Sequence, residues 1–516
     1  MLRRAFSMLQ PLRPATRRRQ AGGASMPPPI GGWNRRDALD QMKPTDAVSL
    51  DNWFPRESDV ISRKGYDLFC STGEADTVDT VVEYFSGATR QLLCATGGKL
   101  LNITSGTASS IQTGFTNDRW FTTMFNGRLF LGNGTDAPQD WTGAALTATA
   151  WTGPSNNNLL TQPLAFKNRL YWVESGTQKF WYGGVGSVTG ALNSFNLAEV
   201  GNFGGNLVAH GVVTQDGGDG VDDLYCAFMS SGEVIIYQGS NPGDATAWGI
   251  VGVFRIGPIV DARAVCKVGS DLLVVTPDGY HPLTRYLAFG RATKDTEAVS
   301  DKISQEASAS VATFSANSGW QAIVYPKGRM LIVNVPTASS SIIQHVMNLD
   351  TRAWCRFTGM NASSWGLYND NLYFGGAAGK VYKADTGYDD DGSAVETDGQ
   401  TAWNYFGDRT RLKKFTLARP IFVSDGDPGA QIGLGIDFDT SLATASVSTP
   451  STSTVAVWDV AVWDVDIWGG NYRTARGWQT VGGLGYCASL RVRTSNDAKD
   501  VRWQATNFVF EPGGLM

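Results

Sequence analysis

The segment Phe125–Leu131 reads Phe-Asn-Gly-Arg-Leu-Phe-Leu, and two later segments repeat its pattern. Phe166–Trp172 reads Phe-Lys-Asn-Arg-Leu-Tyr-Trp, and Tyr368–Phe374 reads Tyr-Asn-Asp-Asn-Leu-Tyr-Phe. In each segment an apolar strand ends on an aromatic residue, a short polar turn follows, and a second apolar strand begins. Asn-Gly and Asn-Asp favour the positive φ angles that tight hairpin turns need. The pattern therefore predicts a series of β-hairpins.

Looser copies of the same hairpin pattern recur along the chain. One aliphatic anchor per copy gives the series Leu92, Leu129, Leu170, Leu224, Leu272, Met330 and Leu372. Successive anchors are 37, 41, 54, 48, 58 and 42 residues apart. Repeats of about 40–50 residues with several strands each predict a β-propeller. Seven hairpins suggest seven blades, but six is also open, because one hairpin can be shared in ring closure or belong to an insertion.

The composition agrees with an all-β protein. The chain has 516 residues with 60 glycines, 17 tryptophans and 18% charged residues, which is typical of a globular protein with many turns. Its six cysteines are far apart and form no Cys-x-x-Cys pair, which argues against a zinc site and a disulfide scaffold. We therefore expect folding in a reducing compartment.

The sequence divides into five parts. We predict a basic disordered tail (1–26), an N-terminal extended arm (27–57), a β-propeller (58–385), an acidic linker (386–400) and a C-terminal β-sandwich-like domain (401–516). The tail carries six arginines and no acid before residue 26, so a targeting peptide and an upstream start codon before Met26 are alternatives. Removing those six charges changes the formal net charge from −5 to −11.

Several local elements follow from the pattern within these parts. The arm contains two short helical candidates, and a third lies in a long insertion of the propeller; they are 38–42, 46–52 and 301–307. The insertions themselves span 185–205 and 287–318. The C-terminal part has four strand-like runs at 416–423, 431–438, 487–492 and 507–510.

The sequence contains little that indicates catalysis. Its three histidines are far apart, and it has no His-Glu-x-x-His, Walker or Gly-x-Ser-x-Gly motif. We predict no enzyme activity, no catalytic residue, no cofactor and no metal ion. A propeller hydrolase stays open as an alternative, because two carboxylates can meet in space without a sequence motif. Asp389–Asp391 resembles a calcium loop, but a solvated acidic turn explains it as well.

Tryptophans supply the candidate interface residues. We predict that they contact neighbouring subunits, where tryptophan is enriched; they are Trp33, Trp53, Trp458, Trp463 and Trp468. The last three recur every five residues and would also suit stacking on a sugar. The basic run Arg409–Lys414 could touch phosphates, although charged residues at a sheet edge also serve to prevent aggregation.

Several stretches resemble the tail nozzle proteins of short-tailed bacteriophages, also called tail tubular protein B. The beginning of the arm carries part of this resemblance in Gly31–Trp33, Leu50–Pro55 and Ser62–Gly65. The turn Leu131–Pro138 and the run Gly232–Pro242 are also similar to segments of phage virion proteins. The likeness covers most of 27–516 as an order of features, and no single motif is diagnostic.

The resemblance implies a non-enzymatic structural subunit of the virion tail, assembled in the host cytoplasm. Six copies would form a homo-oligomeric ring below a tail adaptor protein, with tail fibre or needle proteins as further partners and genomic double-stranded DNA in the lumen. An acidic chain suits such a conduit, because negative walls repel the DNA backbone. No apolar run is long enough to span a membrane. A carbohydrate-binding tail appendage built on a propeller is the main alternative.

Overall fold

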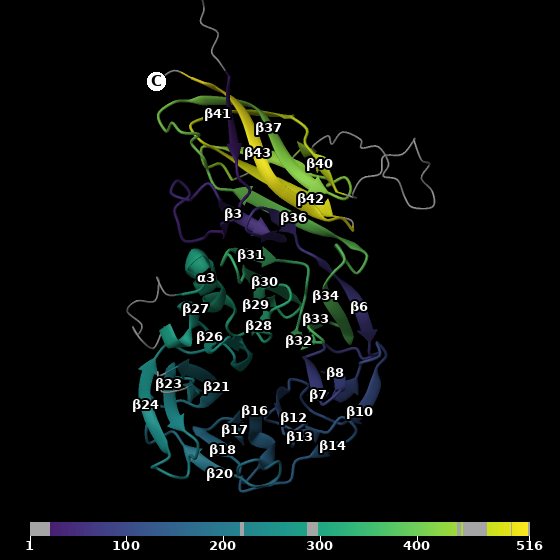
Figure 1. Cartoon of the computed structure of the whole chain (residues 1–516), viewed down its shortest axis with the longest axis vertical. Helices are drawn as coiled ribbons and strands as arrows, with labels where there is room; N and C mark the ends of the chain where they lie inside the picture. The colour runs from purple at the N-terminus through teal and green to yellow at the C-terminus, as the bar shows by residue number, and fades with distance from the viewer. Residues whose placement is uncertain are drawn as a thin grey trace, which may run out of the picture.

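The computed structural model describes residues 21–216, 221–285, 298–440, 445–446, 472–496 and 498–513. Within these ranges the protein is mostly β-strand, arranged in many small sheets, as the sequence predicts (Figure 1). The predicted helix at 301–307 is present as a 3-10 turn (Asp301–Ile303) followed by α3 (Ser304–Phe314).

The three hairpins that carry the sequence pattern are confirmed. Asn126-Gly127, Lys167-Asn168 and Asn369-Asp370 each join two paired antiparallel strands. Both residues of every turn have a φ between 43° and 74°. This is the backbone of the two-residue turn whose twist matches that of the flanking strands. The sequence pattern therefore predicted the position and the positive φ angles of these turns.

Seven small antiparallel sheets contain the repeated hairpins, and in each of them sequence neighbours pair with one another. The first four are β7 (Thr80–Ser86), β8 (Thr89–Thr96), β9 (Lys99–Asn102) and β10 (Ser109–Thr113); β11 (Phe121–Phe125), β12 (Arg128–Gly132), β13 (Gln139–Trp141) and β14 (Leu146–Ala148); β16 (Leu160–Phe166), β17 (Arg169–Glu174), β18 (Lys179–Tyr182) and β20 (Asn193–Asn196); and β21 (Leu207–Asp216), β22 (Val221–Met229), β23 (Glu233–Gly239) and β24 (Trp248–Arg255). A short parallel pair is formed by β15 (Trp151–Thr152), which precedes the third sheet in the chain, and β19 (Gly190–Ala191), which comes between β18 and β20.

The remaining three sheets follow the same plan. They are β25 (Val265–Val268), β26 (Asp271–Thr276) and β27 (Gly279–Pro282); β28 (Gln321–Tyr325), β29 (Met330–Ala338), β30 (Ser341–Asn348) and β31 (Trp354–Phe357); and β32 (Ser364–Tyr368), β33 (Asn371–Gly375) and β34 (Lys380–Thr386) with β6 (Gly65–Ser71). The last two of these are parts of one larger sheet, in which β3 (Asp46–Asp51), β36 (Ser393–Thr401) and β35 (Asp389–Asp390) connect β31 to β6. Every aliphatic anchor of the repeat lies on the second strand of its sheet, from Leu92 on β8 to Leu372 on β33. The spacing of the anchors therefore predicted the succession of sheets.

The sheets follow one another around a common centre, which gives a propeller-like arrangement (Figure 1). The last sheet contacts the first, because β32 lies against β7. Glycine permits this approach: a Cβ on Gly366 would lie 2.5 Å from the Val81 carbonyl oxygen, and one on Gly375 would lie 2.1 Å from that of Val78. The outer strand of the last sheet is β6, which comes from the beginning of the described chain.

The N-terminal arm differs from the prediction. Residues 46–52 were expected to be helical, but Asp46–Asp51 form strand β3, which pairs with β36 (Ser393–Thr401) and with β2 (Gly32–Trp33). The 38–42 segment is made of turns and bends rather than a helix. Tertiary contacts override the local helix signal here, because Asp46 is fully buried and its carboxylate accepts hydrogen bonds from Asn34 and Lys302.

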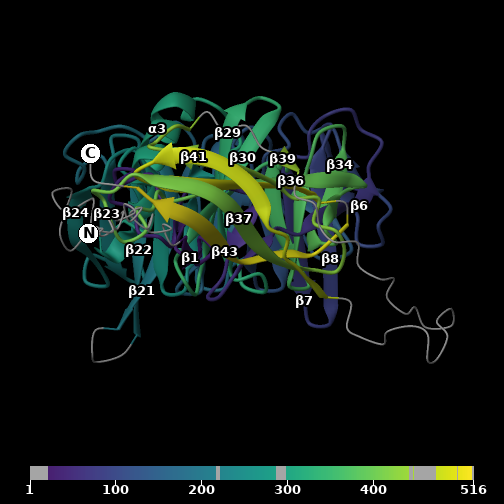
Figure 2. The same cartoon turned by 90° about the horizontal axis from the view of Figure 1, so that it is seen from above.

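The C-terminal part consists of two groups of strands stacked on the end of the molecule (Figures 1 and 2), one of them a separate sheet and the other an extension of the larger sheet. One sheet has β37 (Lys413–Ser424) between β43 (Val501–Pro512) and the pair β40 (Arg473–Ala475) and β41 (Gln479–Gly485). The other joins β36 to β42 (Ala488–Asn496) and then to β38 (Gln431–Ile436), which also pairs with β39 (Ala445–Ser446). The four strand-like runs predicted in this region are confirmed.

Three predicted boundaries need correction. The acidic stretch 386–400 is not a linker: it contains β35 (Asp389–Asp390) and β36, which is an interior strand of a sheet. The predicted tail includes β1 (Gly22–Met26), which pairs with β43. The strand β5 (Val60–Ser62), expected in the propeller, pairs with β4 (Trp53–Pro55) and β43 in the C-terminal sheet. The acidic composition of this stretch led to the linker prediction, although in β36 the charged side chains alternate with buried ones, as they do in a strand.

One buried arginine, Arg63, forms contacts that link the arm, the acidic stretch and the sheet arrangement. Arg63 has a side chain that is 1% exposed, and it forms a two-pronged ion pair with Asp390 at 2.6 and 2.7 Å. It also donates to Asn52 Oδ1 and to the Thr358 carbonyl oxygen. These partners belong to the arm, to the segment between β31 and β32, and to the acidic stretch. Arg63 therefore fixes the arm and the C-terminal sheets against the sixth and seventh sheets.

Candidate functional site

The centre of the sheet arrangement contains a cavity of about 340 Å³. It is lined by the first strands of five sheets, β7, β11, β25, β28 and β32, together with the residues just before β25. The walls are mixed, with hydroxyls such as Thr80 beside aromatic rings such as Trp365. Because residues from five sheets meet in this cavity, it is a candidate functional site.

Arg263 lines this central cavity and also the smaller pocket next to it. Its guanidinium donates to the carbonyl oxygens of Asp79 and Trp120 at 2.7 and 2.8 Å, and to Thr80 Oγ1 at 3.0 Å. The group also lies over the ring of Phe121, 5.5 Å from its centroid. Arg263 thus crosses the centre of the molecule and joins the fifth sheet to the first and second.

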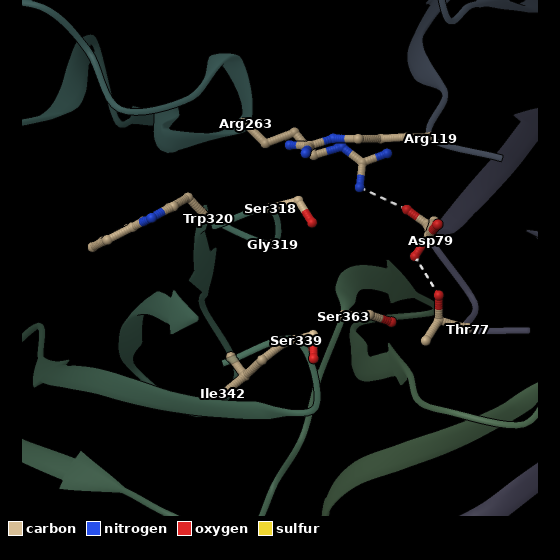
Figure 3. Close-up of a pocket in the computed structure, with 10 residues that line it drawn as sticks. All are labelled: Thr77, Asp79, Arg119, Arg263, Ser318, Gly319, Trp320, Ser339, Ile342 and Ser363. Atoms are coloured by element: carbon tan, nitrogen blue, oxygen red, sulfur yellow. Dashed lines mark hydrogen bonds between the residues drawn. The ribbon is translucent and has the colours of Figure 1, made fainter. Parts of the chain in front are cut away.

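The smaller pocket, of about 100 Å³, also has Arg263 in its lining (Figure 3). Two guanidinium groups, from Arg119 and Arg263, lie along one wall, and serine residues from three other segments surround the space. Arg119 forms an ion pair with Asp261 at 2.6 Å. Among the described residues, no carboxylate lies within ion-pair distance of Arg263. Burial first, and the neighbouring charge of Arg119 second, lower the pKa of Arg263 to about 9, so it remains cationic at pH 7.

A larger and more open cleft, of about 720 Å³, lies where the arm and the C-terminal sheets meet the sixth sheet. Two ion pairs lie among its charged side chains: Arg56 with Asp59 at 2.7 Å, and Arg329 with Asp350 at 2.6 Å. Asp385 accepts a hydrogen bond from Tyr325, and burial raises the pKa of its carboxyl group.

The structure places the predicted interface tryptophans away from the surface where it describes them. Trp33 is 3% exposed and packs edge-on against His345, and Trp53 is 0% exposed and packs against Trp503. Both belong to the main hydrophobic core, so the prediction that they contact a neighbouring subunit is wrong. They are buried because their strands, β2 and β4, pair within the chain. The other three, Trp458, Trp463 and Trp468, lie outside the described residues.

The other candidates from the sequence have structural roles. Asp390 pairs with Arg63, and Asp391 accepts a hydrogen bond from the backbone N–H of Leu68, so this acidic turn is used within the fold. Lys413, from the basic run, is 2% exposed and donates to the carbonyl oxygens of Asp408 and Tyr486. Within the described ranges, no three histidine, cysteine or acidic residues are grouped as metal ligands would be.

Two buried histidines bond to tyrosine hydroxyls. The Nδ1 atom of His210 lies 2.9 Å from the hydroxyl of Tyr225, and that of His345 lies 2.8 Å from the hydroxyl of Tyr280. Burial lowers the pKa of His210 to about 4, and burial together with the charge of Arg356 lowers that of His345 to about 3. Both rings are therefore neutral at pH 7 and act as hydrogen-bonding elements of the core.

The arginines at the centre were missed in the sequence. Arg119 and Arg263 each follow an aspartate closely, in Asp118-Arg119 and Asp261-Ala-Arg263, and each lies just before the first strand of a sheet. That shared position was a usable signal. Their partners were not predictable, since Asp79 precedes Arg263 by 184 residues.

Comparisons with known proteins give no family for the chain. No protein-family model matches it, and no curated protein matches it in sequence. Solved structures with a partial likeness include the computationally designed Ika8 protein, with 8% identity, a TM-score of 0.36, and coverage of 62% of this chain and 99% of that one. BBS1N in complex with ARL6DN has 11% identity and a TM-score of 0.40, with 62% and 97% covered. BamB from Moraxella catarrhalis has 11% identity and a TM-score of 0.35, with 64% and 92% covered. At these TM-scores the likenesses carry no argument about function.

No helix in the described part of the chain is both long and apolar enough to cross a membrane.

Proposed function

We propose that the protein is a structural subunit of the tail nozzle of a short-tailed bacteriophage. In this proposal six copies form a ring below the tail adaptor protein, conduct genomic double-stranded DNA during ejection, and retain it before then. The arm segments Gly31–Trp33 and Leu50–Pro55, which resemble nozzle proteins, support it. Tail fibre or needle proteins would attach to the same ring, and the chain would act without catalysis.

The proposal includes a finer description of the fold. We infer that the seven sheets are the blades of a closed propeller, with the C-terminal sheets forming a β-sandwich. The pairing of β6 with β34 supports closure, because it completes the last blade with a strand from the beginning of the chain. Such a joint resists opening, since the first and last blades cannot separate without breaking a strand ladder. A rigid body of this kind suits a part that must withstand the passage of DNA.

The observation that carries the ring proposal is a pair of exposed apolar surfaces on different parts of the chain. On the C-terminal sheet, β37 and β41 line a shallow apolar hollow of about 470 Å³, beside which Leu484 is 61% exposed. On the fourth sheet, the outermost strand β24 exposes Ile250 and Val251 at 50% and 49%. A ring needs a head-to-tail contact between two unlike surfaces, and exposed apolar patches are typical of such contacts.

The charge balance supports DNA as the content of the ring. The formal net charge is −5, and a negative lumen would repel the phosphate backbone and let the duplex slide. The central cavity of a single chain is not the channel in this proposal, because Arg263 crosses it. The DNA would pass between the copies instead, through the opening of the ring.

Native mass spectrometry of the purified protein tests the interface. We expect a hexamer for the natural sequence, and loss of that species in Leu484→Asp and in Ile250→Asp, because each places a charge in an apolar contact. Phe85→Asp is the matched control: Phe85 is also 50% exposed but lies on neither surface, so this variant should remain hexameric. Hexamers that persist in both interface variants would refute the proposed contact.

A further inference from the structure

The small pocket at the centre has features that the nozzle proposal does not use. It presents two guanidinium groups side by side, from Arg119 and Arg263, in a space of about 100 Å³ (Figure 3). The guanidinium of Arg263 donates hydrogen bonds to three neutral oxygens, which are two backbone carbonyls and the Thr80 hydroxyl. Asp261 pairs with Arg119 alone. The two cations therefore share one ion-paired carboxylate within the described part of the chain.

Within the described residues Arg119 has an ion-pair partner and Arg263 has none, although the negative charges of Asp261 and Asp79 also act on Arg263 and raise its pKa against the effect of burial. Like charges held close together repel most strongly where water is partly excluded. The lowered pKa of Arg263 has the charge of Arg119 as its second cause, after burial, which agrees with this repulsion. An anion placed between the two guanidinium groups would offset it. Guanidinium is also the side chain whose planar set of donors matches the oxygens of phosphate or carboxylate.

The remaining lining supplies further donors and limits the size of the ligand. Ser318 and Ser339 are exposed residues, here called the serine rim, and Figure 3 shows both among the residues that line the space. Asp79 is the acid of the lining, and its side-chain oxygen Oδ1 accepts a hydrogen bond from Thr77. Pockets for drug-sized ligands measure about 300–1,000 Å³. A space of about 100 Å³ is too small for a nucleotide or a sugar and suits an ion of a few atoms.

We propose that this pocket is a binding site for a small inorganic oxyanion, of the class of phosphate and sulfate. The ion bridges Arg119 and Arg263 and accepts hydrogen bonds from the serine rim. The site lies within a single chain, so it goes beyond the nozzle proposal and does not depend on ring formation. Because Arg263 connects three sheets, the bound ion also strengthens the centre of the fold.

Isothermal titration with inorganic phosphate, and separately with sulfate, at constant ionic strength set with sodium chloride tests the site. We expect saturable binding of one ion per chain. Arg119→Gln should weaken binding at least tenfold, because it removes one of the two cations. Ser339→Asp should weaken it to a similar extent, because it places a negative charge at the rim on an exposed residue and leaves the core untouched.

Ser340→Asp is the matched control, since Ser340 is the next residue, is also exposed, and does not line the pocket. It should keep the affinity within about twofold of the natural sequence. The Ser339→Asp variant keeps the test valid even if Arg119→Gln does not fold. Absence of saturable binding to the natural sequence, or equal affinities in Ser339→Asp and Ser340→Asp, would overturn the proposal. A chain that forms no rings but binds phosphate would leave this inference standing and count only against the nozzle.

Discussion

Replacing Arg63 with methionine is the most informative perturbation of the fold. The arginine side chain is 1% exposed, and its removal leaves the carboxylate of Asp390, itself 10% exposed, without its cation. The oxygen of Asn52 and the carbonyl of Thr358 lose a donor at the same time. The change therefore leaves a largely buried charge without its partner and removes one donor from each of two acceptors, of which Asn52 Oδ1 keeps the N–H of Thr358, at the junction of the arm, the C-terminal sheets and the sheet arrangement.

The expected loss in the free energy of unfolding is large. Removing one partner of a buried ion pair costs about 3–5 kcal/mol, chiefly because the other charge remains buried and unpaired. The pair Arg329–Asp350 provides a matched comparison: its bond length is also 2.6 Å, but its side chains are 69% and 39% exposed. Exposed pairs contribute about 0–1 kcal/mol. Arg329→Met should therefore unfold almost like the natural sequence.

Urea unfolding followed by tryptophan fluorescence measures the difference, and the buried Trp53 and Trp503 near this junction supply signal. The double variant Arg63→Met with Asp390→Leu should recover much of the loss, because it removes the stranded charge as well. If Arg63→Met costs no more than Arg329→Met, the idea that Arg63 holds the parts together is wrong.

Two further predictions concern the contact between the first and last sheets and the buried histidines. Gly366→Ala should lower the free energy of unfolding in urea by about 1–3 kcal/mol, because its Cβ would lie 2.5 Å from the Val81 carbonyl oxygen. The control Gly249→Ala has open space around the new Cβ and should change that free energy by no more than about 0.5 kcal/mol. Equal effects of the two substitutions would refute the close contact. Stability should be fully present above pH 6.5 and fall as the pH decreases toward 4, by up to about 1.4 kcal/mol per pH unit for each of His210 and His345, because the unfolded histidines bind protons that the folded ones exclude. Urea midpoints that stay flat between pH 7 and 5 in the natural sequence, or that fall as steeply in His210→Gln, would contradict the second prediction.

Local patterns in the sequence predicted much of the fold because the hairpin turns depend on nearest neighbours. Asn126-Gly127 and Asn369-Asp370 adopt positive φ angles in any context that joins two strands tightly. Predictions failed where distant partners decide. Asp46 lies in a strand rather than a helix because Lys302 and Asn34 bind its buried carboxylate, and the sequence near Asp46 contains no sign of Lys302.

The candidate site was less predictable than the fold for the same reason. The central arginines acquire their roles from segments more than 140 residues away, as the bond from Arg263 to Trp120 shows. The tryptophan interface was predicted from residue type alone, and residue type does not show whether a tryptophan is buried in the core, as Trp53 is, or exposed on the surface. The acidic stretch became strand β36 because Arg491 and Arg493 neutralise Asp398 from the neighbouring strand.

Single-particle electron microscopy of the purified protein, over a range of concentrations, tests the central claim most directly. The nozzle proposal predicts closed rings of six copies whose central opening is wide enough for a DNA duplex, with the C-terminal sheet of one copy against β24 of the next. Particles that remain single chains at every concentration, also in the presence of the adaptor, would contradict it.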